Sequence, residues 1–234
     1  IDTGQSNMRR QALGIADTLK FGSILLTHHH EDHSGNADAL RHLKKVSVYG
    51  HEVSIPKLRA GFRILLYQHV VWGRAGTVQV QPLPEKIEGS GCCLVPIHTP
   101  GHSRDHTVFF DRDNGRLFSG DLFLGTKIKY FRADERIADT IDSLKKVLSL
   151  DFDALFCCHN PQPAGGKAML EKKLQYLEDL TGEIRTLLGK GYDRNAIMKA
   201  LYPRYREATV IKYATFCNVS FANIIRSLER HQHD

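Results

Sequence analysis

The chain has 234 residues, of which 41% are hydrophobic and 25% are charged. This composition excludes a disordered or fibrous protein, and the length suits one large domain or one domain with a helical extension. No apolar run approaches the roughly 20 residues that a membrane span needs, and the first residues lack a signal pattern, so we expect a soluble protein.

The five cysteines are Cys92, Cys93, Cys157, Cys158 and Cys217. An odd number with two adjacent pairs favours a reducing compartment over a disulfide framework, so we expect a cytoplasmic protein. The formal net charge is +6, and residues 166–234 hold 12 Lys and Arg against 8 Asp and Glu. This basic surplus is compatible with an anionic partner such as RNA, although a solvated helix face is the simpler explanation.

The first part of the chain alternates between helical and strand patterns. Apolar spacing predicts a helix over 8–19, a buried strand over 21–27, a helix over 36–44 and a strand over 46–49. Such α/β alternation favours functional sites at the carboxyl ends of strands. The pattern of residues 51–76 is the least regular, and we expect a helix and a lid over the site there.

The rest of the chain changes from short strands to helices. We expect a hairpin at Asp113-Asn114-Gly115, a helix over 137–148, and strands over 78–80, 93–97, 107–110, 117–118 and 154–158. After Gly165-Gly166 the apolar spacing predicts one long helix, followed by shorter helices over 195–201, 208–216 and 220–228. The change predicts two regions, a catalytic domain over 1–165 and a helical C-terminal region over 166–234.

Four side chains able to bind a metal lie within six residues, after the first predicted strand. They are His28, His30, Asp32 and His33. In an extended segment His28 and His30 face the same side, and the other two follow where the chain turns through Ser34-Gly35 into a helix. One short segment can therefore serve two adjacent metal ions.

Three later fragments also end a predicted strand with a metal-capable side chain. They contribute His102 in the segment 99–103, Asp121 in 119–121 and His159 in 157–159. The complete set has five histidines and two carboxylates, which suits two borderline metal ions with positions left open for water. Zinc is the first choice, with iron or manganese as alternatives.

The ordered set of His28-x-His30-x-Asp32-His33, His102, Asp121 and His159 resembles the metallo-β-lactamase superfamily. Asp2 in Ile1-Asp2-Thr3-Gly4 matches the first motif of that family. The resemblance implies an α/β fold, a four-layer αββα sandwich of two mixed β-sheets with helices on both outer sides. Members normally carry about two or more strands before the first motif, so we expect either an N-terminally incomplete domain with an exposed sheet edge or strands that come from elsewhere.

The resemblance also implies how the ligands divide between two metal ions. His28, His30 and His102 would hold the first ion, Asp32, His33 and His159 the second, and Asp121 would bridge both. The implied activity is that of a metal-dependent hydrolase, because two Zn²⁺ would depress the pKa of a shared water toward about 7 and give a hydroxide nucleophile. Asp32 would also orient that nucleophile or pass a proton to the leaving group.

Three features narrow the choice within the superfamily. True β-lactamases usually have cysteine or another residue in place of Asp121, which disfavours antibiotic hydrolysis. The flavodiiron oxidoreductases tend to have glutamate in place of His30, which disfavours a redox function. Only 37 residues separate Asp121 from His159, which excludes nucleases with a large inserted domain.

Three functions remain open. The leading one is hydrolysis of a carbonyl ester, thioester or lactone, as in the glyoxalase II-like branch, with a small and possibly anionic substrate. The second is cleavage of single-stranded RNA, because the sequence of residues 100–106 and the helices predicted after it also resemble the small β-lactamase-like endoribonucleases. The third is a mononuclear iron persulfide dioxygenase, which shares these motifs.

Residues beside the ligands have less specific expected roles. We expect His29 and Glu31 to point away from the cluster toward solvent, because side chains alternate along an extended segment. His98 is expected to be packed or hydrogen-bonded. Asp105 and His106 would either support the ligands or stabilise their loop.

Two other groups are weaker candidates. Lys127, Lys129 and Tyr130 would reach an anionic or carbonyl substrate if their loop faces the site, and otherwise are solvated. Cys157 and Cys158 are expected to be small buried hydrophobic side chains, because at most one of two consecutive strand residues can face a metal.

Overall fold

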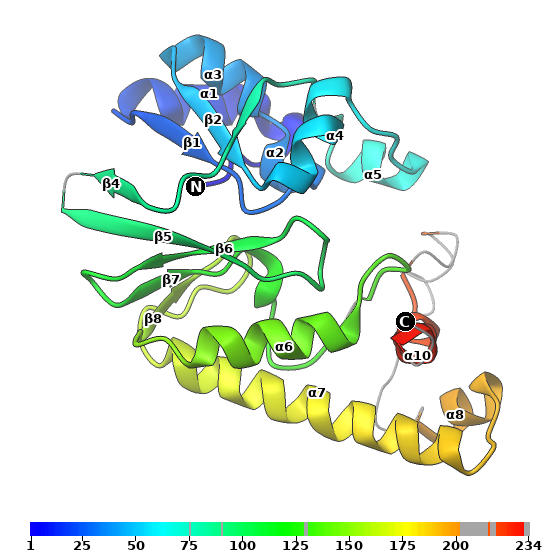
Figure 1. The fold of residues 1–234 in the computed structure, drawn as a ribbon. Coiled ribbons are helices and arrows are strands. Elements are labelled where there is room, and N and C mark those ends of the chain that lie inside the picture. The colour runs from blue at the N-terminus through cyan, green and yellow to red at the C-terminus, as the bar shows by residue number, and fades with distance from the viewer. Residues whose placement is uncertain (75, 90, 129–130, 202–214, 216–218, 232–234) are drawn as a thin grey trace. The chain divides into compact units, whose positions relative to one another are not determined.

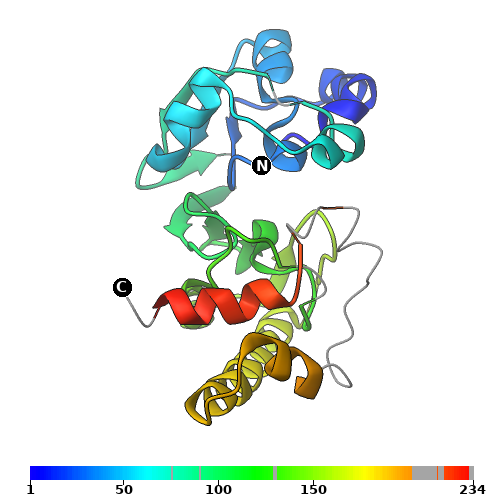
Figure 2. The same cartoon turned by 90° about the vertical axis from the view of Figure 1, so that its right-hand side faces the viewer.

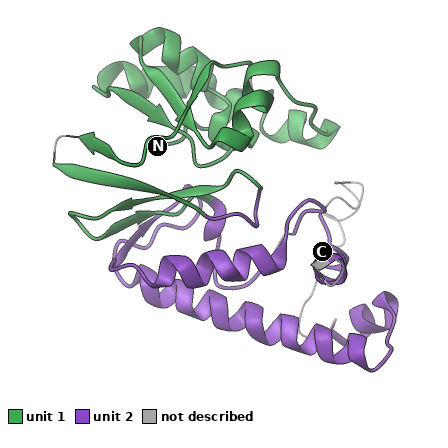
Figure 3. Cartoon of the chain, viewed as in Figure 1, with its two compact units in different colours: residues 1–98, 104–120 green, residues 99–103, 121–234 purple. Residues whose placement is uncertain are grey.

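The structure is a computed structural model that describes residues 1–74, 76–89, 91–128, 131–201, 215 and 219–231. Two compact units can be distinguished (Figure 3): unit 1 comprises Ile1–His98 and Arg104–Gly120, and unit 2 comprises Thr99–Ser103 and Asp121–Asp234. This division rests on contacts and differs from the division at 165 and 166 inferred above, which stays a prediction. Lys129, Tyr130, Cys217 and, apart from Thr215, the helix predicted over 208–216 lie outside the described residues.

A three-stranded parallel sheet forms the first part of unit 1. Its order is β1 (Ser23–Leu25), β2 (Ser47–Gly50) and β3 (Val80–Pro82). Parallel strands need a crossover between them, and here the crossovers contain helices (Figure 1), including α3 (Ala37–Lys44) and α4 (Ile55–Ala60). The predicted α/β alternation is therefore confirmed.

The core of this part is apolar on the helix-facing side of the sheet. Helix α1 (Arg9–Thr18) joins it, and the buried side chains are Ala16, Ile24, Leu26, Ala37, Leu40, Val48, Leu58, Val78 and Val80. β1 is shorter than the strand predicted over 21–27, because the Thr27 amide donates to the Asp2 carboxylate at 2.8 Å instead of to a neighbouring strand. Strand pairing thus ends just before the histidine cluster, so the side chains that follow can serve as the predicted metal ligands.

Short helices complete this part of the unit. They are η1 (Ser6–Met8), α2 (Glu31–Ser34), η2 (Glu52–Ser54) and α5 (Leu66–Val71). α2 was not predicted and is separate from the expected helix, which is α3, so Asp32 and His33 lie on a helical turn and not ahead of one. Residues 51–76 do contain helices, while their role as a lid stays a prediction.

Unit 1 also contains four consecutive antiparallel strands of a second sheet. Their order is β4 (Ile87–Gly89), β5 (Cys92–His98), β6 (Thr107–Asp111) and β7 (Arg116–Phe118). β6 and β7 form the predicted hairpin, with Gly115 at a φ of 58° in its turn. The sequence analysis missed β4, because Ile87-Glu88-Gly89 is short and shows no apolar alternation.

Unit 2 is mainly helical (Figure 2). It contains α6 (Ile137–Leu148), the short strand β8 (Ala154–Phe156), α7 (Gly166–Gly189), α8 (Arg194–Leu201) and α10 (Ala222–His231). α6 packs on α7, and both α8 and α10 contact α7. Fully buried leucines on these helices, among them Leu144, Leu170 and Leu177, explain the packing, because their periodic spacing gives each helix one apolar face. Among the described residues, no helix is both long and apolar enough to cross a membrane.

Candidate metal centre

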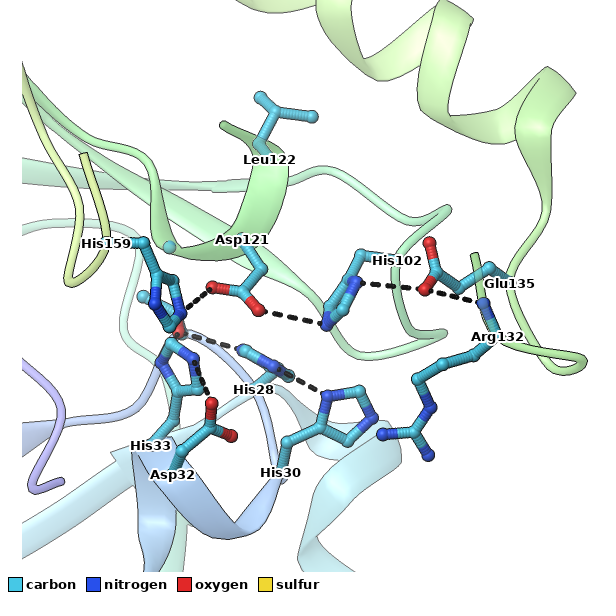
Figure 4. A network of polar contacts seen from close by, with 12 residues as sticks. His28, His30, Asp32, His33, His102, Asp121, Leu122, Arg132, Glu135 and His159 are labelled. Atoms are coloured by element: carbon cyan, nitrogen blue, oxygen red, sulfur yellow. Dashed lines mark hydrogen bonds and ion pairs between the residues drawn. The ribbon is translucent and has the colours of Figure 1, made fainter. Parts of the chain in front are cut away.

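Three predicted ligands of unit 1 lie close together: His28 and His30 follow β1, and His33 is on α2. The ring centroid of His28 is 4.5 Å from that of His30 and 4.1 Å from that of His33. All three side chains are buried, and His28 Nε2 lies 2.9 Å from His30 Nδ1 (Figure 4). Protonated imidazoles this close would repel one another, so at least some of them are neutral and present lone pairs, as a metal ion requires.

Asp2 determines which nitrogen of His33 carries the proton. Its Oδ2 lies 2.8 Å from His33 Nδ1, and its Oδ1 accepts the Thr27 amide at 2.8 Å. A carboxylate in contact with Nδ1 keeps the proton on that atom, so Nε2 carries the lone pair. Asp2, the residue that matched the first family motif, therefore orients the predicted ligand His33. The backbone φ of Asp2 is 56°.

Thr27 has the corresponding relation to His28. Its hydroxyl donates to Asp2 Oδ2 at 2.9 Å, and the same oxygen lies 3.0 Å from His28 Nδ1. Because the hydroxyl proton is used on Asp2, the oxygen accepts from Nδ1–H of His28, and Nε2 carries the lone pair. The sequence analysis missed Thr27, since a threonine at the end of an apolar strand is an ordinary strand residue.

Asp32 is the most accessible predicted ligand in this unit. Its side chain is 20% exposed, and Oδ2 lies 3.8 Å from His33 Nε2. It therefore lies next to the nitrogen that Asp2 leaves available, on the turn of helix that α2 adds after His30.

His29 and Glu31 are not solvent-exposed, so that prediction was wrong. His29 is 8% exposed and Glu31 only 1%. The backbone amide of His29 donates to Asp105 Oδ2 at 2.8 Å and its Nδ1 contacts Oδ1 at 2.8 Å, while Glu31 Oε1 accepts from Gln68 Nε2 at 3.1 Å. The alternation argument failed because unit 1 covers both sides of the ligand segment and supplies polar partners there.

The contacts of Asp105 favour stabilisation of the ligand loop as its role. It holds both the backbone and the ring of His29, directly between two predicted ligands. His106 is fully buried, with its ring 5.2 Å from that of His28. His98 is hydrogen-bonded as predicted, with Nε2 2.9 Å from the Arg104 carbonyl oxygen, and it stacks on His51.

Unit 2 brings the other three predicted ligands together. His102 comes from the segment Thr99–Ser103, Asp121 from η3 (Gly120–Leu122), and His159 follows β8. Asp121 Oδ2 lies 3.3 Å from His102 Nε2, and its Oδ1 lies 3.4 Å from His159 Nε2 (Figure 4). One carboxylate thus directs one oxygen to each of two histidines.

Glu135 is a member of this group that the sequence did not indicate. Its Oε1 lies 3.6 Å from His102 Nδ1 and accepts the Arg132 amide at 3.1 Å. Burial lowers the pKa of His102, but the carboxylates of Glu135 and Asp121 outweigh burial, so the net pKa is raised. Asp134-Glu135-Arg136 is a charged sequence of the kind common on protein surfaces, and only the folded loop brings Glu135 to the His102 imidazole.

Glycine and α6 determine the course of the His102 segment. Gly101 has a φ of 135°, and a Cβ there would meet the Thr140 backbone nitrogen at 2.5 Å. Ser143 Oγ donates to the Pro100 carbonyl at 2.7 Å, and the Arg136 amide donates to that of Gly101 at 2.8 Å. The segment can lie this close to the helix only because residue 101 lacks a side chain.

Two weaker expectations have different outcomes. Cys158 is exposed and Cys157 partly exposed, so the expectation of small buried hydrophobic side chains was wrong. The chain leaves the strand at Phe156 and turns, with the Asn160 amide 3.1 Å from Cys157 Sγ. Lys127 is exposed, and its contact with a substrate stays a prediction.

The predicted ligands form two sets, His28, His30, Asp32 and His33 in unit 1 and His102, Asp121 and His159 in unit 2, and both sets have the chemistry of a metal site. Both contain imidazole nitrogens and carboxylate oxygens, the donors that zinc, iron and manganese accept. In each set a carboxylate contacts the second nitrogen of a histidine, Asp2 on His33 and Glu135 on His102. Such outer carboxylates orient metal-binding histidines in proteins, so the residues present fit metal ions.

Comparison with known sequences identifies relatives. Residues 1–159 match the family described as the metallo-beta-lactamase superfamily. The hydroxyacylglutathione hydrolase of Aeromonas salmonicida is 32% identical over 162 residues, which cover 68% of this chain and 55% of that protein. The atrochrysone carboxyl ACP thioesterase of Aspergillus fumigatus is 30% identical over 160 residues, covering 64% and 43%. The chain spans about half the length of the curated relatives it matches.

Solved structures show the same fold. A metallo-beta-lactamase family protein from Thermus thermophilus has a TM-score of 0.70 at 21% identity, covering 99% of this chain and 84% of that one. A protein solved in a di-iron-bound form is 29% identical, with a TM-score of 0.56 and coverage of 71% and 83%. These likenesses confirm the predicted fold class. With more than half of its residues matched by the family, the chain belongs to the metallo-beta-lactamase superfamily.

Proposed function

We propose that the chain is a metal-dependent hydrolase that cleaves a carbonyl ester, thioester or lactone. Two Zn²⁺ are the first choice of cofactor, with iron or manganese as alternatives. The proposed ligands are the seven residues named from the sequence: His28, His30, Asp32, His33, His102, Asp121 and His159.

The observation that carries this proposal is the geometry of Asp121. Its two oxygens lie 3.3 Å and 3.4 Å from Nε2 atoms of two different histidines, His102 and His159. A carboxylate that served one ion alone would need only one such neighbour. The arrangement therefore supports the bridging role proposed for Asp121 between two ions.

The side chains of the site have distinct tasks in this proposal. Two bound cations would act as Lewis acids and lower the pKa of a coordinated water toward about 7. Asp2 and Glu135 orient His33 and His102 as ligands through contacts with their Nδ1 atoms. Asp32, partly exposed beside His33, would orient the attacking oxygen or carry a proton to the leaving group.

The names of the relatives favour a thioester within this substrate class. One is a hydroxyacylglutathione hydrolase, whose name describes an acyl group on a thiol, and another is a thioesterase. A thioester has a good leaving group, so little proton transfer is needed at the moment of cleavage, and one partly exposed carboxylate suffices. A small thioester is therefore the first substrate to test.

Metal content and activity of the same preparation test the proposal. We expect two transition-metal ions per chain, turnover of an acyl-glutathione thioester, and loss of at least about a hundredfold in kcat on Asp121→Asn. Asp179→Asn is the matched control, because Asp179 is an exposed carboxylate on α7 that contacts Gln175.

Parallel assays on a lactone and on single-stranded RNA separate the alternatives. Cleavage of RNA alone, weakening with added salt, would favour the endoribonuclease function instead. One iron per chain with oxygen consumption would favour the persulfide dioxygenase. Full thioesterase activity in Asp121→Asn would refute the proposed site.

A further inference from the structure

A buried lysine of unit 2 lies beside the turn that carries Asp121. Lys173 is on α7, and its side chain is almost completely buried, with 8% of the residue exposed. Its Nζ donates to the carbonyl oxygen of Leu122 at 2.6 Å, which is a short, charge-assisted bond. Leu122 directly follows Asp121 on η3 (Figure 4), so the lysine holds the peptide next to the proposed bridging ligand.

The charges around Lys173 belong to the same group of residues. Burial lowers its pKa from 10.5 to about 8, and the nearby negative charges of Glu135 and Asp121 oppose that effect. Asp121 is a proposed ligand, and Glu135 contacts the ligand His102. The ammonium therefore lies near two carboxylates of this half of the site.

Helix packing alone gives no reason for a lysine at this position. Leu170 and Leu177, one turn away on either side, are fully buried and supply the apolar contacts of the helix. Burying a charge costs free energy, so packing alone would favour an apolar side chain of similar size at this position. The contribution that an apolar side chain could not make at 173 is therefore the bond to the Leu122 carbonyl, together with the charge near Glu135 and Asp121.

We propose that Lys173 is a positioning residue for Asp121, so that α7 helps to orient a ligand of the metal centre and is not only a packing element. By holding the Leu122 carbonyl it restricts rotation of the peptide that follows Asp121, and thereby the direction of the Asp121 side chain. The metal part of this inference rests on the proposed function. The anchoring of the turn does not depend on it.

The test compares two variants of the full chain. Lys173→Met removes the donor and the charge but keeps an unbranched chain of similar length. Leu177→Ala, the matched control, creates a cavity in the same helix one turn away and contacts nothing on η3 through a polar bond. Both variants are examined well below their midpoint temperatures of unfolding, so that global unfolding does not contribute to the measured differences.

The first measurement is amide hydrogen exchange of metal-free protein. We expect Lys173→Met to accelerate exchange of amides 121–123 about tenfold, because one hydrogen bond of the turn is lost, whereas Leu177→Ala leaves those amides unchanged. Unchanged exchange at 121–123 in Lys173→Met would overturn the inference, whether or not the protein binds metal.

The second measurement is titration of each metal-free protein with Co²⁺, followed by its visible absorption. We expect Lys173→Met to bind Co²⁺ about 10- to 100-fold more weakly than the unsubstituted protein, with an altered spectrum, and Leu177→Ala to match the unsubstituted protein. Equal affinity and spectrum in all three would overturn the metal part of the inference. An unsubstituted protein that binds no Co²⁺ would instead refute the proposed function, while the exchange data still decide the anchoring.

Discussion

Asp2 Oδ2 lies 2.8 Å from His33 Nδ1, which joins the first residues of the chain to the histidine cluster. The contact keeps the proton on Nδ1 and directs Nε2 away as the ligand atom. We expect Asp2→Asn to weaken Co²⁺ binding about 10- to 100-fold, because an amide can present its NH₂ group to Nδ1 and favour the other tautomer. Titration followed by absorption measures this effect.

Asparagine is the appropriate substitute because Asp2 has a φ of 56°, which Asn tolerates better than most residues. Asp17→Asn is the control, since Asp17 is exposed on α1 and belongs to neither set of proposed ligands. Wild-type affinity in Asp2→Asn would contradict the assigned role of this carboxylate.

Gln68 links α5 to the ligand segment. Its Nε2 donates to Glu31 Oε1 at 3.1 Å and its Oε1 accepts the Leu65 amide at 2.7 Å. Gln68→Ala removes both bonds and leaves Glu31 without this donor, so we expect faster proteolysis within 61–76 and a loss of about 1–3 kcal/mol in stability. Limited proteolysis and urea unfolding measure these effects.

The neighbouring substitution His69→Ala is the control for Gln68→Ala, because the described contacts of His69 include no side-chain bond to the ligand segment. An equal cleavage rate in the two variants would show that the Gln68 contacts do not restrain this segment.

Gly35 allows the turn after α2 to pack closely against the start of the chain. A Cβ at this position would meet the carbonyl oxygen of Glu31 and the Ser6 amide nitrogen, the latter at 2.7 Å, and both are backbone atoms. We expect Gly35→Ala to destabilise the fold by about 1–3 kcal/mol or more.

Gly14→Ala is the matched comparison for Gly35→Ala, because Gly14 lies inside α1 with no atom within 4 Å of the added Cβ. It should raise the free energy of unfolding by about 0.5–1 kcal/mol. Thermal unfolding of the two variants checks both signs, and equal stabilities would contradict the packing described for Gly35.

Lys173 predicts a specific dependence of stability on pH. Its pKa is lowered from 10.5 to about 8 in the fold, first by burial. Below pH 8 the lysine is charged in both folded and unfolded chains, so the cost of burial is fully present. Between about pH 8 and 10.5 the folded chain loses this proton first, and stability rises relative to Lys173→Met by up to roughly 3 kcal/mol.

Urea unfolding of metal-free protein at pH 7 and pH 10 measures this effect. The difference in stability between the unsubstituted protein and Lys173→Met should shift in favour of the former at pH 10, since other titrating groups are common to both. A difference that does not change with pH would show that Lys173 keeps an ordinary pKa.

Local patterns predicted many elements correctly because the relevant forces act over short distances in sequence. α6 begins and ends at Ile137 and Leu148, as predicted, because one apolar face and a terminal turn determine its bounds. The β6–β7 hairpin follows from Asp113-Asn114-Gly115, where Gly115 has the positive φ that the turn needs. The seven candidate ligands came from short motifs that follow predicted strands, and their binding of metal is still a proposal.

The partners of those ligands could be found only from the tertiary structure. Asp2 and His33 are 31 residues apart, and His29 and Asp105 are 76 apart, distances at which no local periodicity connects them. His29 and Glu31 were expected in solvent because alternation describes one strand and not what packs against its outer side. Glu135 and Lys173 are ordinary charged residues in the sequence, and only folding of unit 2 brings them to His102 and to the Asp121 turn. The sequence by itself determined the candidate ligands and the family, whereas the environment that orients the ligands depends on long-range packing.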